Sequence, residues 1–139
     1  MYELRPFRQN PWVPIINNTG SQLPALGIVA PTGWDANNGA IQVALPDRNE
    51  QAGLLVLGWW NIDDGGINLA CRARVVWALY DPADGTPAVG EVWGSGKSSH
   101  KLRKRLLGWR ILVVDSGNVR VLAQREDLYQ TSVAFLGVP

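Results

Sequence analysis

The sequence predicts an all-β, single-domain protein: a Greek-key or jelly-roll-like sandwich or barrel that follows an extended N-terminal arm. Fifteen glycines and nine prolines are spread through the 139 residues rather than clustered. Short runs rich in Val, Ile, Leu and Trp lie between them, and turn sequences recur roughly every 8 to 14 residues, as in sandwiches and barrels. No helical periodicity continues beyond about two turns.

The first element is the arm. Pro6 and Pro11 lack the backbone N–H that the interior of a sheet or helix requires. We therefore expect residues 1–11 to be an extended N-terminal arm with Tyr2 and Phe7 as aromatic anchors. Residues 12–139 then form the β-domain.

The first half of the domain alternates apolar runs with turns. Asn38-Gly39 suits a tight hairpin because both residues tolerate left-handed backbone conformations. Gly53–Trp60 is a continuous apolar run, too short for a membrane span and typical of a buried strand. The expected strands of this half are 12–18, 26–30, 40–45 and 53–60.

The second half begins with an alternating segment, residues 67–80, which predicts one long strand. Polar side chains should face outward and one set of small or apolar side chains should face the core. That inward set is Cys71, Ala73, Val75 and Trp77. Asp81–Gly85 is a turn, because proline sets the backbone angle and Asp-Gly closes it. Further strands are expected at 89–93, 109–115, 119–124 and 131–136, with helix confined to 101–107 and 125–128.

Composition excludes several classes of protein. Cys71 and His100 are the only residues of their types, so an intrachain disulfide, a multi-cysteine zinc site and a histidine-rich metal site are all excluded. No run of about 18 apolar residues predicts a membrane span, and the N-terminus does not read as a secretory signal. The net charge of +1 gives no global attraction to nucleic acid or membranes. We expect no metal and no cofactor.

The candidate catalytic groups all have simpler interpretations. Asp63–Asp64 precedes two glycines and is typical of a hairpin turn rather than a carboxylate pair. His100 follows Ser98–Ser99 in a basic loop, where neighbouring cations disfavour a protonated imidazole. Cys71 is expected to be a buried thiol, and Gly90–Ser98 lacks the spacing of a phosphate-binding loop. The sequence therefore predicts a protein that is not an enzyme.

A basic segment, residues 97–110, is the strongest charge signal. It holds six Lys and Arg residues and no acid. Such a segment docks onto an acidic protein surface or nucleic acid, or forms a solvated loop. Nucleic acid is disfavoured because no aromatic side chain for base stacking lies between 97 and 108.

Tryptophan is unusually frequent, with seven residues. Trp59 and Trp60 are adjacent, and in a strand their rings would face opposite sides, so at least one should lie outside the core. Exposed tryptophans are favoured at protein interfaces and also stack on sugars. We expect most of the seven to fill the core.

Several short stretches carry a resemblance to a known class of protein. Ile16–Gly20 followed by Leu26–Ile28, then Gly90–Gly94 and Gly108–Leu112, resemble small β-rich structural proteins of tailed bacteriophages, of the capsid decoration (cement) or fibre-base type. The resemblance implies an extended arm, a compact β-domain and no catalytic group. It carries over no contact residue, because such proteins share no fixed contact motif.

The expected function is therefore that of a virion structural protein, made in the host cytoplasm, that binds and stabilises the capsid lattice. Its partner would be the major capsid protein or another virion protein, and a homotrimer is favoured over a dimer because lattice junctions are symmetric. A carbohydrate- or receptor-binding module of a phage tail or fibre is the alternative, and a small hydrolase comes third. The residues expected to bind the partner are Tyr2, Phe7, Trp12, Trp59, Trp60, Lys97, Lys101, Arg103, Lys104 and Arg105.

Overall fold

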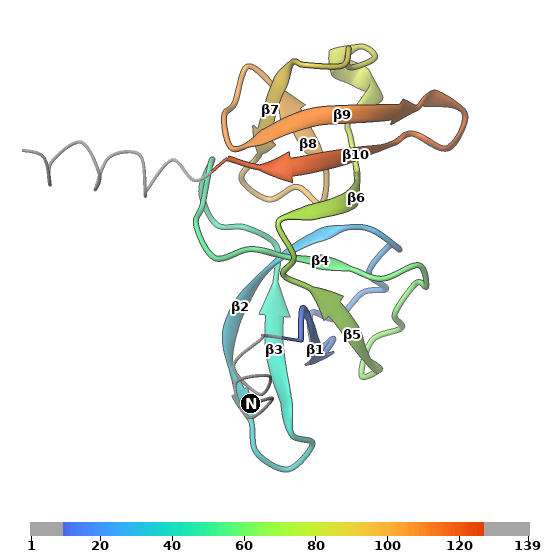
Figure 1. Ribbon diagram of the computed structural model, residues 1–139. Coiled ribbons are helices and arrows are strands. Elements are labelled where there is room, and N and C mark those ends of the chain that lie inside the picture. Colours follow the sequence, from blue (N-terminus) through green and yellow to red (C-terminus); the bar gives the residue numbers. More distant parts are fainter. Residues whose placement is uncertain (1–9, 127–139) are drawn as a thin grey trace, which may run out of the picture.

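A computed structural model describes residues 10–126 of the chain, and in this range the protein consists of ten strands and short turns (Figure 1). Five strands close into a barrel in the order β1-β3-β2-β4-β5. These strands are β1 (Trp12–Ile16), β2 (Ile28–Asp35), β3 (Ala40–Ala44), β4 (Leu55–Leu57) and β5 (Ile67–Cys71). The other five form a second sheet in the order β6-β10-β9-β7-β8. They are β6 (Val75–Leu79), β7 (Val92–Ser95), β8 (Leu102–Lys104), β9 (Trp109–Asp115) and β10 (Arg120–Arg125).

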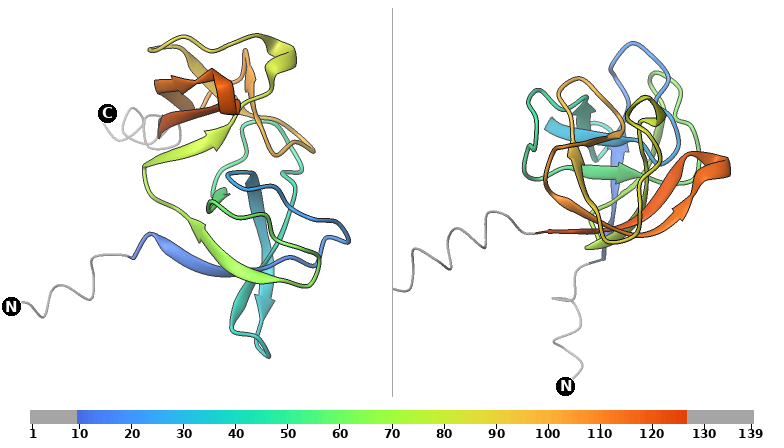
Figure 2. Two further views of the ribbon diagram at one scale, coloured as in Figure 1. Left: turned by 90° about the vertical axis from the view of Figure 1, so that its right-hand side faces the viewer. Right: turned by 90° about the horizontal axis from the view of Figure 1, so that it is seen from above.

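The all-β prediction is confirmed, and the architecture is a closed barrel that carries a second sheet. Figure 2 shows, from above, that the second sheet lies over the barrel. Two short 3-10 turns, η2 (Pro82–Asp84) and η3 (Ser116–Asn118), connect strands of the second sheet. The Greek-key or jelly-roll connection stays a prediction. Tyr2, Phe7 and the strand expected at 131–136 lie outside the described residues.

The hairpin between β2 and β3 forms where the Asn-Gly pair predicts it. Gly39 adopts a φ of 60°, and the Asp35 carboxylate accepts the backbone N–H groups of Asn37 at 3.0 Å and Asn38 at 3.1 Å. β4 pairs with β2 only at Ile28 and Val29. The outer part of β2 therefore pairs with β3 alone, whereas β3 also pairs with β1 at Ile41 and Gln42.

Strand β4 and the start of β2 are buried on both faces. In β4, Leu55 and Leu57 point into the barrel, whereas Val56 joins the core beneath the second sheet. In β2, Val29 faces the barrel interior and Ile28 faces the second sheet. A strand covered on both faces has to be apolar at every position. This explains why the sequence around β4 is a continuous apolar run.

The second sheet is built around aromatic side chains. Tyr80 and Trp93 contact edge to face with ring centroids 6.0 Å apart, and Trp109 is buried in the same cluster. A single parallel bridge from Tyr80 to Leu102 joins edge strand β8 to the chain just after β6. The sheet therefore curls until its two edges nearly meet.

The expected strand over 67–80 is wrong, because the chain divides there into β5 and β6. Residues 72–74 leave the ladder between the barrel and the second sheet, and the Arg72 N–H bonds to the Pro11 carbonyl at 2.8 Å. After this break the alternation changes phase. Val76 and Ala78 are buried and Val75 is exposed, so the inward face predicted beyond Cys71 is also wrong.

The helix expected at 101–107 is wrong as well. Leu102 and Arg103 belong to β8, which pairs with Ser95 and Gly94 of β7. Gly94 allows the segment that follows β8 to pass very close, because a Cβ there would lie 2.3 Å from the Leu107 carbonyl oxygen. At the other expected helix, Arg125 ends β10 and residues 127–128 lie outside the described part.

Candidate functional site

The exposed tryptophans all belong to the barrel half of the molecule. Residues Trp60 and Trp34 are 71% and 60% exposed, and Trp59 and Trp12 are 49% and 38% exposed. β4 ends at Leu57, so Trp59 and Trp60 lie in a loop and both are exposed. The expectation that most of the seven tryptophans fill the core is wrong, because only Trp93 and Trp109 are buried.

Trp59 is held in place by side chains of the second sheet. The Arg120 guanidinium lies 4.9 Å from the centre of the Trp59 ring and 5.4 Å from that of Trp77. The two rings are 6.3 Å apart and tilted by 56°. Cations over indole faces are attracted by the ring quadrupole. We call Trp59, Trp60, Trp77 and Arg120 the aromatic cluster.

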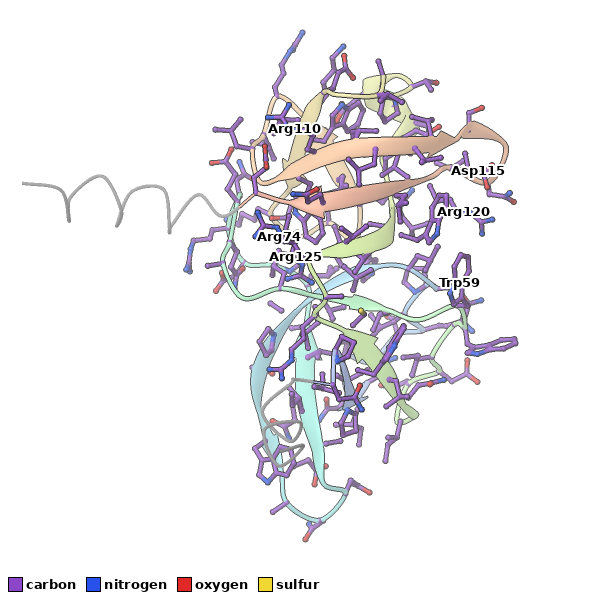
Figure 3. The ribbon with its side chains drawn as sticks, viewed as in Figure 1. Trp59, Arg74, Arg110, Asp115, Arg120 and Arg125 are labelled. Carbon is purple, nitrogen blue, oxygen red and sulfur yellow. The ribbon has the colours of Figure 1, made fainter. Side chains whose placement is uncertain are left out.

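A carboxylate fixes the arginine of this cluster. Arg120 Nε donates to Asp115 Oδ2 at 2.9 Å, and Figure 3 shows Trp59, Arg120 and Asp115 on the same side of the molecule. Hydrogen bonds from Asn118 and then Arg120 lower the pKa of Asp115 below its usual value. The carboxylate is therefore charged at neutral pH, and the aromatic cluster is organised before any partner binds.

Trp12 extends this apolar surface along the barrel. Its ring lies 3.6 Å from the position that a Cβ on Gly58 would take, directly before Trp59. On the same face Pro14 of β1 stands opposite the exposed Leu69 of β5. The fold thus brings Trp12, at the start of β1, to the Trp59–Trp60 loop.

Two arginines of the basic segment form ion pairs with carboxylates from other parts of the chain. Arg103 Nε lies 2.7 Å from Asp84 and 3.5 Å from Asp81, and Arg110 lies 2.7 Å from Glu126. The hydrogen bond from Arg103 lowers the pKa of Asp84. The remaining partner candidates of this segment are Lys97, Lys104 and Arg105, which are exposed, and Lys101, which is half-buried.

His100 is half-buried beside a cavity of about 520 Å³. Burial lowers the pKa of His100, and its Nδ1 has no hydrogen-bond partner among the described residues. The cavity wall is rich in neutral hydroxyl and amide groups, including Thr19, Thr32 and Gln42. Ser99 does not pair with the imidazole, because its hydroxyl binds the backbone of Lys101.

A second cavity, of about 570 Å³, lies where the barrel meets the second sheet. We call it the arginine cleft, because four arginines line it: Arg48, Arg72, Arg74 and Arg125. They come from the loop after β3, the connection between β5 and β6, and the end of β10. No local spacing in the sequence links these positions, so sequence reasoning missed the cleft.

Within 10–126 no group of three or more His, Cys, Asp or Glu residues could hold a metal ion, and Cys71 is buried. In the same range no helix is long and apolar enough to cross a membrane.

Comparisons of the chain with protein-family models, with curated proteins and with solved structures gave no match. Function is therefore inferred from the geometry of the chain itself.

Proposed function

We propose that the chain is a non-enzymatic structural protein of a virion that binds an assembled capsid lattice and stabilises it. The observation that carries this proposal is the aromatic cluster, where Trp59, in contact with Arg120, stands beside Trp60, which is 71% exposed. Tryptophan and arginine dominate the few residues that supply most of the binding energy in protein interfaces.

The energetics favour a protein partner for this surface. Covering a large apolar side chain contributes about 1.5–3 kcal/mol, and at the aromatic cluster little ordering entropy opposes that gain. Arg120 already fixes the Trp59 ring against Trp77. Trp12 adds apolar area next to the same loop.

Stabilisation of the lattice follows from mass action. A protein that binds only the assembled lattice, at a concentration 100 times its Kd, stabilises that lattice by about 2.7 kcal/mol per site. In this proposal Tyr2 and Phe7 of the arm are further anchors, and Lys97, Lys104 and Arg105 meet acidic patches at the rim. A homotrimer at a symmetric lattice junction, with a dimer second, completes the proposal.

The test uses virions of the virus or prophage whose genome encodes the chain. Mass spectrometry of gradient-purified virions should detect the protein, and the purified chain should sediment with capsids that lack it. Trp60→Ala should lose most of this co-sedimentation. Trp34→Ala, which removes another largely exposed ring, on the β2–β3 hairpin, is the matched control. Absence from virions, or unchanged binding by Trp60→Ala, would overturn the proposal.

A carbohydrate-binding module is the second candidate, and the cavity beside His100 favours it. Its neutral hydroxyl and amide lining is the chemistry that hydrogen-bonds sugar hydroxyls. Binding to a glycan array that is lost in Gln42→Ala and retained in Trp60→Ala would support this candidate. Capsid binding with the opposite pattern would support the decoration protein.

A further inference from the structure

The arginine cleft has an unbalanced charge. Four arginines and two glutamates, Glu50 and Glu126, line it, which leaves a net charge of +2. Both glutamates already have partners. Glu50 Oε2 accepts the Leu107 N–H at 2.6 Å, and Glu126 Oε1 lies 2.7 Å from Arg110. Of these arginines, Arg74 and Arg125 form no ion pair with a carboxylate among the described residues, so their charge is not neutralised by the acids of the cleft.

Arg125 is the deepest of these cations. Its two terminal nitrogens donate to the carbonyl oxygens of Leu54 at 2.6 Å and Cys71 at 3.2 Å, and its guanidinium covers the Trp109 ring at 4.8 Å. Among the described residues no carboxylate pairs with it, and its Nε has no partner. Burial lowers the pKa of Arg125 to about 10, so it stays charged at neutral pH. A partly buried cation without a counter-ion favours an anion beside it.

Arg74 makes this charge accessible. It is exposed on the connection between β5 and β6, and Figure 3 shows it next to Arg125. Arg48, on the loop after β3, lines the same cleft and is 3.6 Å from Asp47. Guanidinium groups on two sides of a cleft can bind one carboxylate by paired, charge-assisted hydrogen bonds.

We propose that the arginine cleft binds an acidic segment of a partner protein, with a carboxylate seated between Arg74 and the rim at Arg48. The volume suits a few side chains, since it falls within the usual range for ligand sites. This inference does not depend on the capsid proposal, because it rests on a different surface and concerns any partner with an acidic segment.

Nucleic acid fits the same cleft less well. The tryptophan in its lining, Trp109, is 4% exposed and covered by Arg125. The described lining therefore offers no aromatic platform for base stacking.

The test is calorimetric titration of the full chain with the capped peptide acetyl-Asp-Glu-Asp-Glu-Asp-Glu-amide. The peptide should bind, and its neutral Asn/Gln counterpart should not. Arg74→Ala should weaken binding about three- to fivefold, the size expected for the loss of one partly exposed ion pair. Trp34→Ala removes an exposed side chain from β2 that does not line the cleft, and it should leave the affinity unchanged.

Three results would overturn the inference. The first is an equal affinity for the acidic peptide in Arg74→Ala and the parent protein. The second is tighter binding of a ten-residue oligothymidylate than of the peptide. The third is peptide binding that appears only in Asp127→Asn. Residue 127 directly follows Glu126, so this last result would make the chain's own C-terminal segment the occupant.

Discussion

The barrel and the second sheet place their large side chains in opposite ways. The barrel interior is filled by aliphatic residues such as Ile15, Val29 and Leu57, and four tryptophans stand on its outside. The second sheet buries Trp93 and Trp109 in its core. The same residue type is therefore a surface feature in one half and a core feature in the other.

The size of the barrel explains this difference. An eight-stranded barrel has an interior just wide enough for side chains to fill, so five strands leave room only for small and branched ones. Indole rings on barrel strands or loops must therefore face outward. The curled second sheet packs its inner face against the outside of β2 and β4, and this wider layer accommodates Tyr80, Trp93 and Trp109.

Charge follows the same division. The pairs Arg103–Asp84, Arg110–Glu126 and Arg120–Asp115 all lie on the second sheet and its connections. In the described part of the barrel half, the ion pair is the exposed Arg48–Asp47 contact. The second sheet thus pairs several of its own surface charges, whereas the barrel exposes apolar rings.

The largest loss of stability should come from removing a large side chain from the core of the second sheet. Trp93→Ala removes a fully buried ring and should lower the free energy of unfolding by about 4 kcal/mol. Trp60→Ala on the barrel should change it by less than about 0.5 kcal/mol. Urea denaturation of both variants measures the contrast. Similar losses in the two variants would contradict the division between core and surface tryptophans.

Gly94→Ala tests the close contact between β7 and the segment that follows β8 in the second sheet. A Cβ would lie 2.3 Å from the Leu107 carbonyl oxygen and 2.7 Å from backbone carbon of Leu106, so the backbone must move. We expect a loss of about 2–3 kcal/mol, in the range of overpacked sites. Gly117→Ala, where the nearest atom is 3.8 Å away, is the control. An unchanged denaturation midpoint for Gly94→Ala would show that the segment after β8 is free to shift.

Arg125→Met tests the link between the two regions. The substitution keeps an apolar cover on Trp109 but removes the hydrogen bonds to Leu54 and Cys71 of the barrel half. We expect a net loss of about 2 kcal/mol, because two charge-assisted hydrogen bonds outweigh relief of the buried charge. Thermal unfolding should then broaden as the halves uncouple. A variant as stable as the parent would mean that apolar packing alone joins them.

Local signals in the sequence predicted part of this arrangement. The turns at Asn38-Gly39 and Asp81–Gly85 formed where residue chemistry required them, and the Asp81 side chain accepts the Ala83 N–H at 2.9 Å. The break at residues 72–74 has no such signal, because alternation continues through it. Local pattern cannot reveal that the chain changes sheets there.

The candidate site was harder to predict than the fold. Adjacent tryptophans correctly indicated an exposed ring at Trp59–Trp60, but Arg120 and Trp77 reach this loop only through tertiary packing. The arginine cleft likewise joins positions far apart in the sequence. Such sites depend on how the barrel and the second sheet dock, which residue spacing does not encode.

Arg120→Ala should lower the free energy of unfolding by less than the three substitutions above. It should also release the Trp59 ring of the aromatic cluster. Losing the cation above Trp59 and Trp77 should cost about 1 kcal/mol. Trp59 should become more mobile. The proposed binding to capsids should therefore lose more free energy than unfolding does. Arg120→Lys, which keeps the charge without the planar group, should recover only part of both. Equal losses of binding and stability would assign Arg120 a purely structural role.

The smallest effect concerns His100, which lies between the two regions and whose carbonyl accepts the Ile28 N–H at 2.9 Å. Burial, and to a lesser extent the charge of Lys101, lowers the pKa of His100 below the value of 6.5 expected when unfolded. The unfolded chain therefore binds the proton more readily, and stability should fall as pH drops below 6.5. The carboxylates of Asp84 and Asp115, whose folded pKa values are lowered below 3.8, lose their contributions only at more acidic pH. Urea titrations between about pH 5 and 7 should show a slope that His100→Gln removes. A slope that persists in this variant would place the acid sensitivity elsewhere.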